Sequence, residues 1–300
     1  MRRFRITHRT TYRYSDSVSS SYGRGFLTPR ELPGQRLLEH RVTVAPAPAD
    51  QASGHDVYGN ADTFFHVTTA HEQLVVTGES SVEVDNPVRP AAADVAWERA
   101  RPSTHCESDE SGARAVEFAL DLNPPEITPA VREYAAQTFV PGRPLSEVVI
   151  DLTHRIYTDF TYESGSTSVS TQVDEVLRER SGVCQDFARL AIACLRSQGL
   201  AARYVSGYLA TDPPPGRERM IGADATHAWA EVWVPGSEDA WVGFDPTNDQ
   251  LADERYIVVA WGRDYADVPP LRGVIYTDAK KSTIAVSVDV APLASVDGVG

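Results

Sequence analysis

The chain has 300 residues, 42% of them hydrophobic and 23% charged, which is enough to bury one large core or two ordinary ones. Its formal net charge is −14, from 28 basic and 42 acidic residues. This negative excess argues against a nucleic-acid partner and against an anionic membrane surface, because both attract concentrated positive charge. Met1–Ile6 carries arginines without an apolar run behind them, so we expect neither a secretory signal nor a membrane-spanning helix.

The three cysteines are an odd number, and their spacing is not typical of a metal site. We therefore expect free thiols in a reducing compartment, and we assign the chain to the cytoplasm. Cys106 follows His105 in a polar stretch, and neighbouring side chains diverge, so this pair is not expected to be catalytic. Cys194 falls on the apolar face of a predicted helix, which indicates a core position.

Residues 1–90 contain short runs in which apolar and polar side chains alternate, as in Phe4–Tyr14 and Leu38–Val44. Gly, Pro, Ser and Asp separate these runs. The pattern predicts a small antiparallel, β-sandwich-like domain. Its histidines form no compact ligand cluster, so we expect no metal there.

Residues 91–127 are rich in proline and contain a Ser/Glu/Asp patch, which predicts a linker or a loosely packed connection. Residues 128–265 are predicted to form a compact core, which begins with helices near Thr128, Ser146 and Thr171. Four strand-like runs follow a further helix: 201–210, 226–234, 241–245 and 256–260.

Between the first two of these runs, the proline-rich loop 211–220 is equally compatible with a substrate-contacting lid and with a simple surface excursion. Residues 266–300 predict a loop and one strand that returns to the body. The end of the chain is expected to fray after Pro292.

Cys184 stands at the start of the predicted helix that follows Thr171. Gly182 allows a tight turn before it, and the helix continues with apolar residues at i+3, i+6, i+7, i+10 and i+11. The unpaired backbone N–H groups and the dipole at a helix N-terminus favour a thiolate, which is the nucleophilic form of cysteine. The position therefore predicts a reactive thiol.

His227 and Asp245 lie on two predicted strands that can pair. Strand alternation places His227 on one face of its strand, and Asp245 closes the next strand. A hairpin centred on Gly236 would set the two directly opposite each other, whereas a later centre would offset them. A histidine can take up the thiol proton, and an aspartate can orient the ring. On spacing alone, core or capping roles for each residue are an equal alternative.

Three motifs in this order resemble the bacterial transglutaminase-like family: Gly182–Ala188, Thr226–Trp229 and Phe244–Asn248. The tail Gly262–Pro270 and the strand-rich N-terminal region are similar as well, so the resemblance covers nearly the whole chain. It implies an α+β fold: a papain-like transglutaminase core, with helices packed on an antiparallel sheet, after the small N-terminal β-sandwich-like domain.

By this resemblance, Cys184 is the nucleophile, His227 the general base and then acid, and Asp245 the orienting group. The implied substrate is a peptide or protein amide that reacts through a thioester, with transfer to water or to an amine acceptor left open. The implied oxyanion hole includes the Cys184 N–H, and Tyr162 or Tyr157 is the upstream side chain that could assist.

Gln185 and Trp229 are expected to support or pack around these groups. We expect no metal and no cofactor, since no EF-hand loop or dense carboxylate cluster is present. The Arg-Gly-Gly run of the related arylamine acetyltransferases is replaced here by Arg180–Val183, which counts against that activity. The alternative function is a non-catalytic binding module that retains the fold, and the oligomeric state is left open.

Overall fold

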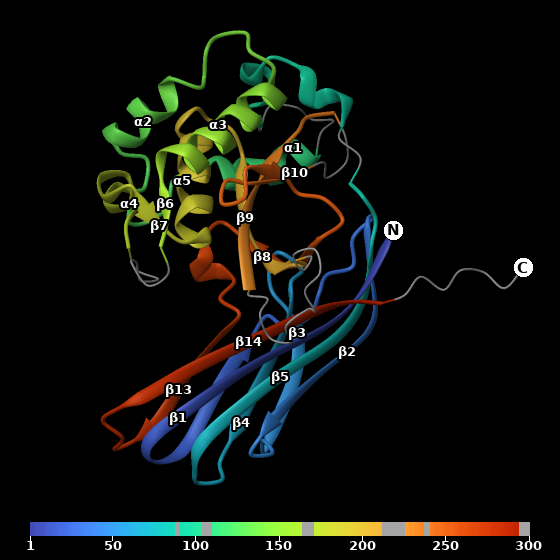
Figure 1. The fold of residues 1–300 in the computed structure, drawn as a ribbon, viewed down its shortest axis with the longest axis vertical. Coiled ribbons are helices and arrows are strands. Elements are labelled where there is room, and N and C mark those ends of the chain that lie inside the picture. The colour runs from blue at the N-terminus through green and yellow to red at the C-terminus, as the bar shows by residue number, and fades with distance from the viewer. Residues whose placement is uncertain (88–89, 104–109, 164–170, 212–225, 237–240, 294–300) are drawn as a thin grey trace, which may run out of the picture.

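The computed structural model describes residues 1–87, 90–103, 110–163, 171–211, 226–236 and 241–293. A body of long strands lies below a body of helices around a second sheet (Figure 1). Cys106 lies outside the described residues, as do residues 212–225, which include most of the proline-rich loop 211–220. In the described part, no helix is long and apolar enough to cross a membrane.

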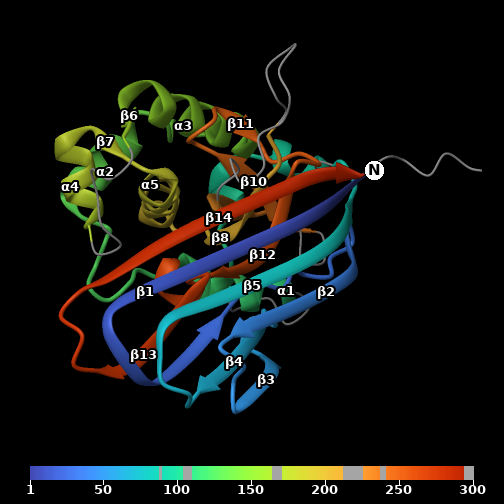
Figure 2. The same ribbon diagram turned by 60° about the horizontal axis from the view of Figure 1, so that its bottom comes forward.

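The lower body is one antiparallel sheet of seven strands. They are β1 (Arg2–Gly25), β2 (Gln35–Ala45), β3 (Asp50–His55), β4 (Ala61–Val67), β5 (His71–Val84), β13 (Leu271–Thr277) and β14 (Ser282–Leu293). The ladder between β1 and β5 is interrupted between Arg13 and Val18. The first half of β1 therefore lies between β5 and β14, and its second half lies between β4 and β13 (Figure 2).

A small apolar core that includes Val18, Phe65 and Leu74 packs on this sheet. The N-terminal region is β-rich, as predicted, and its strands belong to a single sheet. The C-terminal region contains two strands, β13 and β14, and both pair with β1. The prediction of a single strand was wrong, because β13 is exposed on both faces and so lacks the alternation that marks a half-buried strand.

The upper body is a five-stranded antiparallel sheet in the order β11-β10-β9-β8-β12. The strands are β8 (Ala202–Leu209), β9 (Thr226–Trp233), β10 (Trp241–Asp245), β11 (Gln250–Leu251) and β12 (Tyr256–Gly262). The helices are α2 (Pro129–Ala136), α3 (Leu145–Asp159), α4 (Val173–Glu179) and α5 (Cys184–Ser197). A short parallel pair, β6 (Thr161–Tyr162) and β7 (Ser181–Gly182), precedes α5. This arrangement is the predicted α+β core.

α5 packs against β9 inside this upper body (Figure 1). Ala228, Ala230 and Val232 of β9 belong to the same apolar cluster as α5, whereas Trp229 belongs to a separate cluster. Because successive strand residues point to opposite faces, α5 covers one face of the sheet and Trp229 lies on the other.

The stretch predicted as a linker is well packed where the structure describes it. It contains η1 (Ala91–Asp94), η2 (Trp97–Ala100), α1 (Glu110–Ala115) and η3 (Val116–Ala119). Trp97 and Phe118 are buried. The loosely packed connection expected from the prolines was therefore wrong for this part, because isolated aromatic anchors carry no periodic signal.

The two bodies share one apolar core. Phe4, Ile6 and Val290 of the lower sheet belong to the same cluster as the helices of the upper body. Gln35 adds a polar contact, because its amide donates to the Val258 carbonyl at 2.7 Å and its oxygen accepts from the Val258 N–H at 2.8 Å. The lower sheet thus supports the underside of the second sheet.

Candidate active site

Cys184 is the first residue of α5 and is partly exposed. The turn before it is tight, since a Cβ on Gly182 would lie 3.0 Å from Cβ of Asp186 and 3.2 Å from Cε1 of Phe187. The Asp186 carboxylate accepts a hydrogen bond from the Val183 N–H at 2.9 Å and so caps the helix. A small residue and a helix cap together hold the thiol at the helix N-terminus.

His227 and Asp245 share one face of the second sheet. The observed register pairs Trp241 with Trp233 and Phe244 with Ala230, so the hairpin is centred one residue later than Gly236. Of the two registers left open by the sequence, the offset one is therefore the observed one. The side chains still meet, with His227 Nε2 2.7 Å from Asp245 Oδ2.

Cys184 completes the arrangement, because its thiol lies near enough to His227 to help raise the pKa of that ring. Because Nε2 of the ring faces Asp245, Nδ1 is the nitrogen left for the thiol. Burial favours the neutral ring, but the hydrogen bonds with Asp245 and Cys184 outweigh burial and raise the pKa of His227 to about 10. The structure therefore brings together the three residues that the sequence singled out.

Asp245 is fully buried, and described groups satisfy both of its oxygens. Oδ2 accepts from His227, from Asn248 Nδ2 at 2.7 Å and from the Tyr256 hydroxyl at 2.7 Å, while Oδ1 accepts from the Thr247 N–H at 2.8 Å. Burial acts to raise the pKa of Asp245, but the hydrogen bonds led by His227 hold it below its usual value. The carboxylate is thus anchored as an anion.

The sequence did not single out Tyr256 or the side chain of Asn248. Asn248 lies in the Phe244–Asn248 motif, and that motif is the one signal that could have pointed to it. Tyr256 belongs to β12, and β12 pairs with β8 rather than with β10. Its contact with Asp245 comes from the folded sheet, so no local sequence pattern predicts it.

The two upstream tyrosines are placed differently. Tyr162 pairs with Gly182 across β6 and β7, its side chain is 53% exposed, and its ring meets the edge of Phe187 at 6.5 Å. Tyr157 lies half-exposed on α3, and no hydrogen bond or ring contact among the described residues joins it to Cys184. Tyr162 is therefore the one that borders the turn before the thiol.

The two remaining predicted residues lie beside the site. Gln185 follows Cys184 on α5 and is partly buried. Trp229 is 1% exposed, stacks near His227 with ring centroids 6.2 Å apart, and meets Tyr256 edge-on at 5.2 Å. Trp229 thus packs behind the histidine. The described residues contain no cluster of three or more His, Cys, Asp or Glu that could hold a metal ion.

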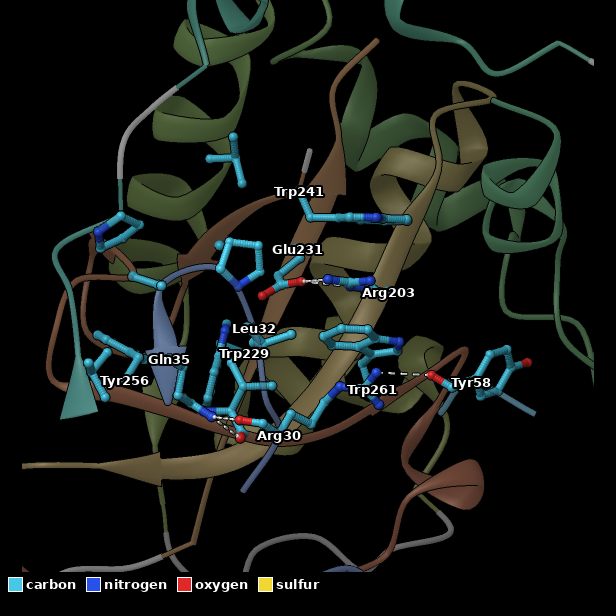
Figure 3. Close-up of a pocket in the computed structure, with 18 of the residues that line it drawn as sticks. Arg30, Leu32, Gln35, Tyr58, Arg203, Trp229, Glu231, Trp241, Tyr256 and Trp261 are labelled. Carbon is cyan, nitrogen blue, oxygen red and sulfur yellow. Dashed lines mark hydrogen bonds and ion pairs between the residues drawn. The ribbon is translucent and has the colours of Figure 1, made fainter. Parts of the chain in front are cut away.

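A cavity of about 1040 Å³ lies between the second sheet and the segment that follows β1 (Figure 3). Arg203 is sandwiched between Trp241 at 4.2 Å and Trp261 at 3.6 Å, and Arg30 covers the other side of Trp261 at 3.5 Å. Glu231 pairs with Arg203 at 2.6 Å. Cys184, His227 and Asp245 are not among the described lining residues, so this cavity lies behind the site rather than forming it.

The His227 contacts predict how stability depends on pH. The pKa of His227 is about 10 in the folded chain, compared with its ordinary value of 6.5. The stabilisation is fully present below pH 6.5 and is lost as pH rises through 10, because the unfolded chain releases this proton first. In urea unfolding from pH 6 to 10.5, the difference in free energy of unfolding between wild type and His227→Gln should therefore shrink as pH rises. A constant difference would contradict the shift.

Comparison with known proteins gives the same picture. The family described as "Bacterial transglutaminase-like N-terminal region" matches residues 4–83, and "Transglutaminase-like superfamily" matches residues 132–246. An uncharacterised protein of Mycobacterium bovis is 63% identical over 296 residues, covering 97% of this chain and 93% of the relative. An uncharacterised protein of Mycobacterium leprae is 32% identical over 299 residues, covering 98% of this chain and 100% of the relative.

Among solved structures, a candidate cysteine protease from Cytophaga hutchinsonii is similar, with a TM-score of 0.73 and 22% identity. The match covers 98% of this chain and 91% of that one, and it shows a shared fold. All three comparisons point to the same family: the two family models, the relatives matched over nearly their full length, and the shared fold. The chain belongs to the transglutaminase-like superfamily and carries the bacterial transglutaminase-like region at its N-terminus.

Proposed function

We propose that this protein is a cysteine enzyme that cleaves or transfers acyl groups from peptide or isopeptide amides. The observation that carries the proposal is the hydrogen-bonded pair of His227 and Asp245, with Cys184 at the start of α5 near enough to raise the pKa of His227. A nucleophile, a base within hydrogen-bonding reach and a third group that orients the base are the arrangement that acyl transfer requires.

The chemistry follows from the geometry. His227 keeps its proton through neutral pH, so the reacting form that we propose is the thiolate of Cys184 beside this imidazolium. Sγ of Cys184 attacks the amide carbonyl, the carbonyl oxygen becomes an oxyanion, and the Cys184 backbone N–H donates to it. His227 then gives its proton to the leaving amine as the C–N bond breaks, which leaves a thioester. Water or a second amine gives a proton to His227, attacks the thioester and releases the thiolate.

Tyr162 is the side chain that we assign to support the oxyanion. Its exposed ring borders the turn that delivers Cys184, so a bound amide can reach its hydroxyl. Tyr157 is the weaker assignment, because it lies on α3 without a described contact to the thiol. We assign supporting roles to Gln185 and Trp229 from their places beside Cys184 and behind His227.

The direct test is to trap the acyl-enzyme with an amide probe that forms a thioester and to measure the mass of the intact protein by mass spectrometry. We expect one acyl group on Cys184 in wild type and none in Cys184→Ala. Cys194→Ala is the matched control and should label normally, because Cys194 is completely buried in the core. Equal labelling of Cys184→Ala would contradict the proposal.

Hydrolysis and transamidation are separated by the acceptor. A primary amine added during turnover should appear in the product if the enzyme transfers acyl groups, and only the free acid should appear if it hydrolyses them. Both results are consistent with a thioester at Cys184, so this experiment decides the reaction type within the proposed class.

A binding module that retains the fold is the second function we consider. It is favoured by the cavity behind the site, because the three residues do not contribute to its described lining. This alternative requires an unreactive Cys184, whereas a protonated His227 near the thiol favours the enzyme.

The proposed chemistry requires a free thiol. Cys184 and Cys194 are both unbridged among the described residues. We therefore propose a reducing compartment, the cytoplasm, and a peptide or protein amide as the partner, without a nucleic-acid or membrane partner. Cell fractionation with an antibody against the chain tests the compartment, and recovery in an oxidising one would contradict it.

A further inference from the structure

The buried anchor of Asp245 includes one donor that comes from a distant strand. The Tyr256 hydroxyl of β12 lies 2.7 Å from Asp245 Oδ2, the same oxygen that faces His227. We propose that Tyr256 is a positioning residue for the His227–Asp245 pair, and that three neighbouring side chains fix the direction of its proton. The inference rests on the proposed function, because it assigns a role at the same site.

The hydrogen-bond partners determine which way each proton points. Arg255 can only donate, and its Nη2 donates to Asp253 at 2.6 Å and to Gln250 Oε1 at 2.9 Å. With its oxygen held by Arg255, Gln250 must turn its amide nitrogen towards the Tyr256 hydroxyl, 2.5 Å away. The hydroxyl oxygen accepts that bond, so its own proton is directed to Asp245.

Tyr256 is held firmly in this position. Its side chain is 3% exposed, and its ring packs against Trp229 at 5.2 Å and His227 at 6.1 Å. Burial, followed by the nearby Asp245 carboxylate, raises the pKa of Tyr256 well above its ordinary value. The hydroxyl therefore stays protonated and remains a donor across the neutral pH range.

This donor has two effects on the pair. It draws negative charge from Asp245 Oδ2, which limits how strongly the carboxylate holds the imidazolium of His227. It also fixes the plane of the carboxylate, so that the ring keeps one orientation. Tyr256 and Asp253 line the cavity of Figure 3, so the outer end of this chain of hydrogen bonds borders that cavity.

The experiment is an NMR titration of His227 in a Cys184→Ala background, which removes the thiol beside the ring so that the response of His227 to Asp245 is read alone. Adding Tyr256→Phe removes the donor and should raise the pKa of His227 by about 0.5 to 1 unit, because the carboxylate charge is less dispersed. Tyr208→Phe is the matched control. Tyr208 is an equally buried tyrosine of the same sheet, but its hydroxyl meets His8 at 3.0 Å. It should leave His227 unchanged.

Arg255→Lys tests the outer part of the chain without changing the charge. Lysine lacks the planar fork that holds Asp253 and Gln250 together, so we expect a shift of the same sign but smaller than that of Tyr256→Phe. A purely structural Tyr256 would lower stability and leave the titration of His227 unmoved, which would overturn the positioning role. An unmoved titration in Arg255→Lys alone would overturn the role of Arg255 and Gln250.

These titrations need no turnover, so they separate this inference from the proposed function. If Tyr256→Phe shifts His227 but no amide probe acylates wild type, the proposed function fails and the positioning of the pair stands. If wild type is acylated but Tyr256→Phe leaves both His227 and the pH profile of acylation unchanged, the proposed function stands and the role of Tyr256 is refuted.

Discussion

An Asp245→Asn variant is expected to lower the rate of acylation by roughly 10³- to 10⁴-fold with little change in the fold. An amide has one acceptor oxygen, whereas Asp245 uses both of its oxygens to accept four bonds. Whichever way the amide turns, its NH2 group faces donors, and the neutral side chain no longer favours an imidazolium. The measurement is the acylation rate with a saturating amide probe.

Asp249→Asn is the matched control for that variant. Asp249 lies four residues away, contacts His154 at 2.8 Å and has a φ of 52°, a conformation that asparagine tolerates. We expect it to acylate at nearly the wild-type rate. An Asp245→Asn protein that stays within tenfold of wild type would contradict the orienting role of Asp245.

Replacing Arg189 with Met is expected to destabilise the fold by about 3 to 5 kcal/mol. Arg189 is 8% exposed on α5 and forms a buried ion pair with Glu126, another with Asp264 at 3.1 Å, and a hydrogen bond to the Thr171 carbonyl at 2.8 Å. Its removal leaves two carboxylates without their cation inside the protein and frees the helix that carries Cys184. Urea unfolding measures the loss, and a cost below 1 kcal/mol would contradict it.

The pH dependence of this loss has a defined sign. Burial, only partly offset by Arg189, raises the pKa of Glu126 from its ordinary 4.5 to about 7. The folded chain therefore binds this proton more tightly than the unfolded chain does, so its contribution weakens stability as pH rises from 4.5 to 7. The free energy of unfolding that Arg189→Met loses relative to wild type should be larger at pH 8 than at pH 5. Glu126→Gln keeps the cation and removes this titration, so it should lose less free energy of unfolding than Arg189→Met does.

The residues of the candidate site could be found from the sequence, because each stands at a readable boundary. Cys184 follows a glycine turn and opens an apolar helix, and both His227 and Asp245 lie on strands with period-two alternation. Their register could not be derived, because it depends on the length and shape of the connection between β9 and β10. A difference of one residue in the hairpin centre was enough to offset the pair.

The groups that hold the site could not be predicted, because their contacts join distant parts of the chain. Tyr256 reaches Asp245 only after β12 has paired with β8, and Glu126 meets Arg189 from 63 residues away. The fold class was readable from helix and strand periods, but β13 was missed because both of its faces are exposed. Local periodicity thus predicts elements, while buried polar partners depend on the assembled fold.

The rate of alkylation of Cys184 by iodoacetamide at pH 6, with peptide mapping to identify the modified cysteine, tests the central claim most directly. The contact between Cys184 and His227 predicts that wild type reacts readily at this pH and that His227→Ala slows the reaction by about 100-fold. Equal rates in the two proteins, or an unreactive Cys184 in wild type, would show that the cysteine and the histidine do not form a reactive pair.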